Sequence, residues 1–173
     1  MLISFDTTFL DYPDPTSLAV VVIMSGCEHH CLGCQNPILQ KTHTAWTEGE
    51  ILGIIEVLQD KCKRNDTNKI VLSGGDPLHP CNRDLSTSIC SILGATHDIC
   101  IYTGYSIEEV KSMSIRGFKY IKCGKYDKDN TQLSEKTDDY IQFVNKTQNL
   151  YNNNYEKLSL DGRFIFNLGV NDA

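Results

Sequence analysis

Short apolar runs alternate with amphipathic stretches along most of the chain. Residues 18–26 form a nearly continuous β-branched run, which is typical of a strand buried on both faces. Other short apolar runs, each bounded by glycine or polar residues, predict three further strands at 69–75, 98–104 and 118–126. Apolar positions at helical spacing lie between and after these strands, and they predict helices at 48–64, 83–96 and 106–113.

The predicted helices carry start signals as well as apolar stripes. Thr47 and Glu50 match a capping box at the start of the first helix, and Ser106 and Glu109 match one at the start of the third. The apolar residues that share one face of the first helix are Ile51, Ile54, Ile55, Leu58 and Cys62. Those expected to face inward from the second helix are Leu85, Ile89, Ile92 and Leu93.

The alternation of strand and helix predicts an α/β fold. Strands and helices at this spacing form βαβ units, so we expect a parallel sheet with right-handed crossovers. About four units are too few for a closed eight-stranded barrel, which leaves an open sheet or a partial barrel. We expect one domain over residues 1–173, with a core at about 18–130 and a polar extension at 131–173. Within that extension, residues 157–168 match a hairpin around Asp161 and Gly162.

The composition and net charge of the chain restrict the classes of function that it can have. The 173 residues are 40% hydrophobic and 22% charged, as is usual for a soluble globular domain. The net charge of −6 argues against a protein that binds nucleic acid or an anionic membrane surface non-specifically. The N-terminus shows no basic leader, and the apolar runs are too short to span a bilayer. We therefore expect a cytoplasmic protein.

Three of the eight cysteines lie in one short loop directly after the first predicted strand. Cys27, Cys31 and Cys34 are spaced C-x3-C-x2-C, and the other five are scattered. A chain of this length does not need disulfides to stabilise its core, so we expect the scattered cysteines to be reduced thiols. Three thiolates on one loop can reach three corners of a [4Fe–4S] cluster, which leaves the fourth iron open to a small molecule.

Two other interpretations of the cysteine loop stay open from the residues alone. Zinc could be held by the three cysteines with His29 or His30 as a fourth ligand, although a ligand so close in sequence would be strained. A redox-active dithiol would use Cys31 and Cys34 and would leave Cys27 unexplained. If the loop holds a cluster, we expect the two histidines to be exposed or to donate hydrogen bonds to cluster sulfur.

A second motif, "SGGDPLHP" at 73–80, follows the second predicted strand. Gly74 and Gly75 can expose backbone groups to a ligand, and Pro77 fixes the turn after Asp76. By itself the motif fits an ordinary turn between a strand and a helix. Because the cysteine loop follows the neighbouring parallel strand, both loops are expected at the same edge of the sheet. A side chain at Gly75 would then block the approach of a ligand.

Together these motifs resemble those of the radical S-adenosylmethionine enzymes. Within that superfamily, the chain is similar to the activating proteins of anaerobic ribonucleoside-triphosphate reductase. The stretches that carry this resemblance span about residues 18–130 and are "MSGCEHHCLGCQNP", "LSGGDPLHP", "IYTGYSIEEV" and "IKCGKYDKD". The family usually has an aromatic residue where this chain has Gln35. It also has glycine–proline–glycine and serine–asparagine–glutamine segments where "DYPDPTSL" and "YNNNYEKL" stand here.

The resemblance implies a truncated partial (βα) barrel of radical S-adenosylmethionine type, with a [4Fe–4S] cluster and S-adenosylmethionine as cofactors. The metal ligands would be Cys27, Cys31 and Cys34. Gly74, Gly75 and Asp76 would meet the amino group of S-adenosylmethionine, and Tyr102 and Thr103 would lie near its polar end. The cofactor-binding residues around the third cysteine would be Gly33, Gln35 and Asn36, with Gly33 and Gln35 on the adenine side.

The resemblance also implies the reaction and the partners. The protein would remove a hydrogen atom from a glycine of a large reductase subunit and leave a glycyl radical there, with electrons from a small flavodoxin-like protein. One alternative is another radical S-adenosylmethionine enzyme, either a formate-lyase-type activase or a deazaguanine-type synthase acting on a small molecule. A non-enzymatic zinc or iron–sulfur module is a further alternative. No insertion is large enough to enclose a small substrate, which favours a protein substrate.

Overall fold

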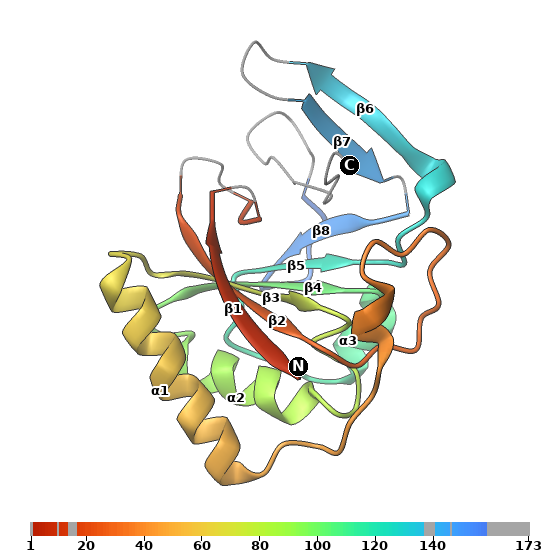
Figure 1. Ribbon diagram of the computed structural model, residues 1–173. Helices are drawn as coiled ribbons and strands as arrows, with labels where there is room; N and C mark the ends of the chain where they lie inside the picture. The colour runs from red at the N-terminus through yellow and green to blue at the C-terminus, as the bar shows by residue number, and fades with distance from the viewer. Residues whose placement is uncertain (1, 10, 14–16, 137–140, 146, 159–173) are drawn as a thin grey trace.

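The computed structural model describes residues 2–9, 11–13, 17–136, 141–145 and 147–158 (Figure 1). Six strands form one sheet in the order β1-β2-β3-β4-β5-β8, and β6 (Thr131–Lys136) pairs with β7 (Ile141–Asn145) in a separate hairpin. The hairpin predicted around Asp161 and Gly162 lies outside the described residues.

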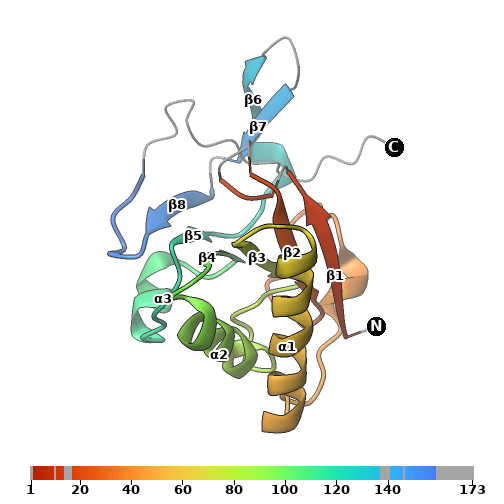
Figure 2. The same ribbon diagram turned by 90° about the vertical axis from the view of Figure 1, so that its left-hand side faces the viewer.

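Four parallel strands form the centre of the sheet and follow one another in chain order. They are β2 (Ala19–Met24), β3 (Lys69–Gly74), β4 (Asp98–Thr103) and β5 (Tyr120–Cys123). The connecting helices are α1 (Glu48–Arg64), α2 (Arg83–Leu93) and α3 (Ile107–Ser112). All three helices cover the same face of the sheet (Figures 1 and 2). The predicted βαβ order is therefore confirmed.

The predicted parallel pairing holds for the four central strands, and two edge strands that were not predicted make the sheet mixed. β1 (Ile3–Thr8) pairs antiparallel with β2, and β8 (Asn149–Asn152) pairs antiparallel with β5. Both edge strands contain polar residues and are largely half-buried, so they lack the continuous apolar run of the central strands. They occupy opposite edges without pairing, so over the described residues the sheet is open rather than a closed barrel.

The sequence signals predicted the starts of the helices correctly and the end of one helix incorrectly. The capping boxes of Thr47 with Glu50 and of Ser106 with Glu109 are both present. Helix α2 ends at Leu93 rather than at residue 96, and Gly94 is its C-cap residue. Ile92 was expected to face inward and is instead 50% exposed.

The central sheet is covered on both faces. The larger core lies between the sheet and the helices, and its fully buried members include Val20, Leu58, Leu72, Leu85 and Ile101. On the other face, Tyr12, Val21, Val71 and Cys100 pack together, and Tyr102 and Tyr120 pack against them. Burial on both faces explains why the central strands are largely apolar and why β2 is mostly valine and isoleucine.

The five cysteines outside the loop are free and buried, so the prediction of reduced thiols is confirmed; they are Cys62, Cys81, Cys90, Cys100 and Cys123. Within the described part of the chain, no helix combines the length and the apolar character that a membrane span requires.

Two isoleucines of α2 provide a matched test of this packing. Ile89→Ala should lower the free energy of unfolding by about 2–5 kcal/mol, because Ile89 is fully buried between α2 and the sheet. Ile92→Ala, on the exposed side of the same helix, should lower it by less than about 1 kcal/mol. Urea denaturation under reducing conditions, followed by circular dichroism, measures both. Equal losses of unfolding free energy in the Ile89→Ala and Ile92→Ala variants would contradict the orientation of α2 described here.

Candidate functional site

The carboxyl ends of the four parallel strands meet at one edge of the sheet, where a cavity of about 230 Å³ is found. The loop after β2 contributes Cys27, Cys31 and Cys34 to the wall. Gly74 and Gly75 at the end of β3 and the ends of β4 and β5 also line it, as do His29 of the cysteine loop and Asp11 and Gln148 from more distant segments. Segments far apart in the sequence therefore share one site.

Nine of the eleven residues that the sequence assigned to the site line this cavity: Cys27, Cys31, Cys34, Gln35, Asn36, Gly74, Gly75, Tyr102 and Thr103. The two other residues, Gly33 and Asp76, are not among the described residues that line it. Gly33 has a φ angle of +70° and lies against the side chain of Lys128. Asp76 is fully buried beside the cavity.

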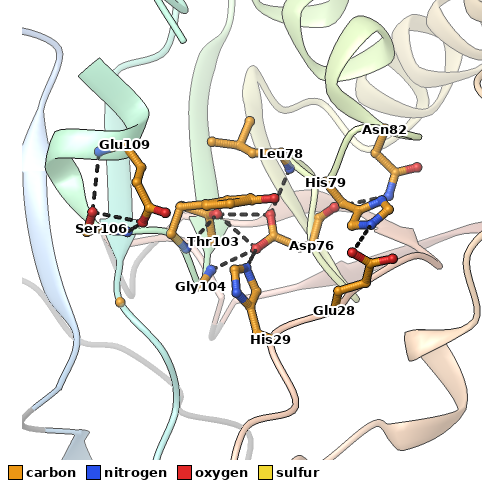
Figure 3. A network of polar contacts seen from close by, with 12 residues as sticks. Glu28, His29, Asp76, Leu78, His79, Asn82, Thr103, Gly104, Ser106 and Glu109 are labelled. Carbon is orange, nitrogen blue, oxygen red and sulfur yellow. Dashed lines mark hydrogen bonds and ion pairs between the residues drawn. The ribbon is translucent and has the colours of Figure 1, made fainter. Parts of the chain in front are cut away.

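The carboxylate of Asp76 collects donors from three loops (Figure 3). Its two oxygens accept hydrogen bonds from the backbone N–H of Leu78 at 2.8 Å, from the Thr103 hydroxyl at 2.9 Å and from the backbone N–H of Gly104 at 2.8 Å. His29 Nε2 lies 2.5 Å from the same carboxylate. A buried carboxylate that accepts several hydrogen bonds is rigidly held, so Asp76 fixes these loops relative to one another.

His29 has a role that the sequence did not predict. We expected an exposed histidine or a donor to cluster sulfur, but its imidazole is only 12% exposed and bonds Asp76. Because the carboxylate of Asp76 accepts hydrogen bonds, His29 Nε2 carries the hydrogen. The ring also packs edge-on against Tyr105 at 4.6 Å between centroids. His30, in contrast, is exposed. His29 thus connects the middle of the cysteine loop to the turn after β3.

The two glycines at the end of β3 are required by contacts with the protein's own backbone. A Cβ atom at Gly74 would lie 2.2 Å from the carbonyl oxygen of Met24, and one at Gly75 would lie 2.5 Å from that of Leu39. The backbone N–H of Gly75 bonds the Met24 carbonyl at 2.7 Å, and that of Asp76 bonds the Gly26 carbonyl at 2.8 Å. The turn is therefore packed against the start of the cysteine loop.

Asn82 and His79 join the site on its buried side. The Asn82 amide donates to the carbonyl oxygens of Ser25 at 2.8 Å and Asp76 at 3.0 Å, and its oxygen accepts from Trp46. His79 Nδ1 lies 2.9 Å from Cys81 Sγ, and its Nε2 lies 3.7 Å from a carboxylate oxygen of Glu28. Asn82 precedes α2 and looks like a helix cap in the sequence, so no local signal could have shown that it bridges two loops.

The comparisons with known proteins agree with this geometry. The model of the family described as "4Fe-4S single cluster domain" matches residues 16–168. The chain belongs to this family. No solved structure is significantly similar to it.

Curated relatives of this chain carry the name "anaerobic ribonucleoside-triphosphate reductase-activating protein", and three of them show the extent of the similarity. The protein of Enterobacteria phage T4 is 29% identical over 128 residues, which are 68% of this chain and 77% of the relative. The protein of Pasteurella multocida is 30% identical over 129 residues, 65% of this chain and 77% of the relative. The protein of Escherichia coli K12 is 33% identical over 101 residues, 55% of this chain and 64% of the relative. The resemblance inferred from the motifs is confirmed.

The donors at the cavity fit the cluster of the 4Fe-4S single cluster domain family. Three half-buried cysteines of one loop line the same wall, and thiolate sulfur is the usual ligand of an iron–sulfur cluster. Nε2 of His29, one of the two histidines that the zinc interpretation offered as a fourth ligand, bonds the carboxylate of Asp76. No three His, Cys, Asp or Glu side chains of the described residues form a group suited to a single metal ion.

The protein environment keeps two of these thiols protonated when no metal is bound. Burial raises the pKa of the Cys27 thiol to about 11; a hydrogen bond from the His29 backbone lowers it, and nearby Asp76, Cys31 and Cys34 raise it. Burial also raises the pKa of Cys31, while a hydrogen bond from the Tyr126 backbone lowers it. Metal ligation by this loop therefore has to displace protons.

The contact between His29 and Asp76 predicts different effects for two adjacent histidines. His29→Ala should lower the free energy of unfolding of the metal-free protein by about 1–3 kcal/mol, because a buried carboxylate loses a donor. His30→Asn keeps a residue that tolerates the φ angle of +49° found there, and should change the free energy by about 0.5 kcal/mol or less. Chemical denaturation measures both, and equal effects would refute the role assigned to His29.

Because Gly75 packs against the backbone of Leu39 and Gly26, a substitution at Gly75 should disturb both the glycine turn and the cysteine loop. Gly75→Ala forces a methyl group onto backbone atoms of Leu39 and Gly26, so it should reduce both the iron content and the free energy of unfolding. Gly53→Ala is the matched control, because nothing lies within 4 Å of the new methyl group in α1. It should be neutral or stabilising by about 0.4–1 kcal/mol. A normal iron content in Gly75→Ala would show that the turn tolerates a side chain.

Proposed function

We propose that this protein is an activating enzyme that uses a [4Fe–4S] cluster and S-adenosylmethionine to generate a glycyl radical on an anaerobic ribonucleoside-triphosphate reductase. One observation carries the proposal: the three cysteines share a cavity with the glycine turn that follows the next parallel strand. The family match and the names of the relatives support it.

Within this proposal, Cys27, Cys31 and Cys34 would hold three irons of the cluster. When bound, the cluster and S-adenosylmethionine supply the one-electron chemistry that starts hydrogen abstraction. The protein contributes position, because the carboxylate of Asp76 accepts hydrogen bonds from His29 and from the end of β4 and so fixes the cysteine loop against its neighbours. A loop held in this way can keep the cluster at a constant distance from the rest of the wall.

The remaining wall of the cavity would bind S-adenosylmethionine. Its polar groups come from the cysteine loop, the glycine turn and β4, and include Gln35, Asn36, Gly74, Tyr102 and Thr103. The four parallel strands in chain order, with their helices on one face, support a truncated barrel of radical S-adenosylmethionine type. The antiparallel strands β1 and β8 would close the edges of that truncated barrel.

Exposed apolar side chains beside the cavity support a protein substrate. Leu32, between two of the cysteines, is 55% exposed, and Ile38, in the short helix η1 (Pro37–Gln40), is 83% exposed. Asn36 and Gln40, on either side of Ile38, both line the cavity. Large apolar groups exposed around a site are typical of surfaces that another protein covers. A reductase subunit docked there would bring its glycine to the cavity.

Electron paramagnetic resonance tests the proposed reaction. The reduced protein, S-adenosylmethionine and the large reductase subunit, mixed without oxygen, should give a glycine-centred doublet that disappears when the target glycine is replaced by alanine. Cys31→Ala should abolish the doublet, because a wall cysteine is lost. Cys90→Ala should retain it, because Cys90 lies on α2 and is buried in the core. A doublet of full intensity with Cys31→Ala, or turnover of a small molecule without any partner, would contradict the proposal.

A further inference from the structure

A buried histidine behind the cysteine loop, His79, has a ring nitrogen to which the proposed function gives no role. His79 belongs to the motif at 73–80, and its side chain is only 8% exposed. Its backbone is fixed in the turn, since its N–H bonds the carbonyl of Asp76 and its carbonyl accepts the N–H of Asn82. On the ring, Nδ1 accepts the backbone N–H of Cys81 at 3.3 Å. The ring hydrogen therefore lies on Nε2.

The Nε2 atom of His79 is buried, and no group of the described residues lies within hydrogen-bond distance of it. A buried N–H without an acceptor costs free energy, so an acceptor within reach would be bound. The carboxylate of Glu28 is within reach, because one of its oxygens lies 3.7 Å from Nε2 (Figure 3). The Glu28 side chain is 71% exposed, so few contacts restrain it. A shift of less than about 1 Å would bring the two atoms to hydrogen-bond distance.

The contact between Glu28 and His79 joins the same two segments as the contact between His29 and Asp76. Glu28 and His29 are adjacent and lie between the first two cysteines of the loop, while Asp76 and His79 both belong to the turn after β3. The loop thus offers an acid and a base, and the turn offers a base and an acid in return. Two contacts of opposite polarity fix a segment in one register, because a slipped segment would place like charges together.

The other side of the imidazole lies at the start of the cysteine loop. Gly26 comes directly before Cys27 and has a φ angle of +107°. A Cβ atom at Gly26 would lie 2.5 Å from Cys81 Sγ and 3.6 Å from His79 Nδ1. His79 therefore lies near the residue that precedes Cys27 through Nδ1 and near the residue that follows it, Glu28, through Nε2. The position of Cys27 depends on both of these neighbours.

We propose that His79 is a positioning residue for the first cluster ligand, and that it holds Cys27 in place by binding Glu28 through Nε2. The inference rests on the part of the proposed function that assigns a cluster to the cysteine loop, and it does not depend on S-adenosylmethionine. Its competitor is a histidine that serves only the packing around Cys81 and Gly26. Glu28 would then be an ordinary exposed carboxylate, whose negative charge can only repel the thiolates of the loop.

The rate at which a chelator removes iron from the cluster-loaded, oxidised protein without oxygen separates these two roles. Glu28→Gln keeps the shape of the side chain but is a weaker acceptor, so it should speed iron release by about threefold to tenfold. The competing role predicts an unchanged or slower release, because a charge that repels the thiolates is lost. Glu56→Gln is the matched control, since Glu56 is exposed on α1, and it should leave the rate unchanged.

A double-mutant cycle assigns the effect to the pair. His79→Asn keeps a polar atom near the position of Nδ1 but has none at that of Nε2, so it should speed iron release as well. The double variant Glu28→Gln with His79→Asn should be within about twofold of the faster single variant, because both changes remove the same contact. His79→Gln, whose amide reaches further toward Glu28, should restore most of the wild-type rate. The urea midpoint of the metal-free Glu28→Gln protein should equal that of the wild type, since an exposed carboxylate adds little to the stability of the fold.

Faster iron release in Glu28→Gln, without further acceleration in the double variant, supports the inference. An unchanged or slower release in Glu28→Gln would overturn it, and so would effects of the two substitutions that multiply in the double variant. A lower urea midpoint for Glu28→Gln would also overturn it, because the carboxylate would then stabilise the fold rather than the ligand. If the wild-type protein takes up no iron and sulfide, the proposed function fails together with the inference, whereas the other outcomes leave the proposed function intact.

Discussion

The carboxylate of Asp76, which solvent does not reach, holds three loops of this protein together. A charge buried to this degree is tolerated only when donors surround it, and here they come from His29, from the backbone of Leu78 and from Thr103 and Gly104. Each donor belongs to a segment that borders the cavity. Loss of one donor would leave part of a buried charge uncompensated, so the loops are held together as a unit.

This constraint explains how a short chain can present a defined site. The sheet supplies the edge, and the backbone bonds from Gly75 and Asp76 to Met24 and Gly26 fix the cysteine loop against the neighbouring strand. On the buried side of the site, the side-chain amide of Asn82 donates hydrogen bonds to Ser25, at the start of the cysteine loop, and to Asp76, in the glycine turn. The thiols and Lys122 therefore face one cavity from separate elements, and a ligand would meet groups that are already in place.

The order of the central strands and helices could be predicted from the sequence, because apolar periodicity and capping are local signals. The meeting of the cysteine loop and the glycine turn followed from that order, since both come after neighbouring parallel strands. The buried strand at β2 and the capping boxes of α1 and α3 are examples. The edge strands β1 and β8 were missed, since half-buried strands with polar residues lack that periodicity. The bond from His29 to Asp76 joins residues 47 positions apart, and Lys122 interrupts an apolar strand without any neighbouring signal. Such contacts depend on the folded chain and cannot be read from spacing.

The central claim is that Cys27, Cys31 and Cys34 hold an iron–sulfur cluster in this cavity, and metal analysis tests it most directly. Protein purified without oxygen should contain about four irons and about four acid-labile sulfides per chain. The Cys31→Ala variant should lose them, and the Cys90→Ala variant should keep them. About one zinc per chain with no sulfide would contradict the account, because a single ion held by the loop would leave no cluster to perform the proposed reaction.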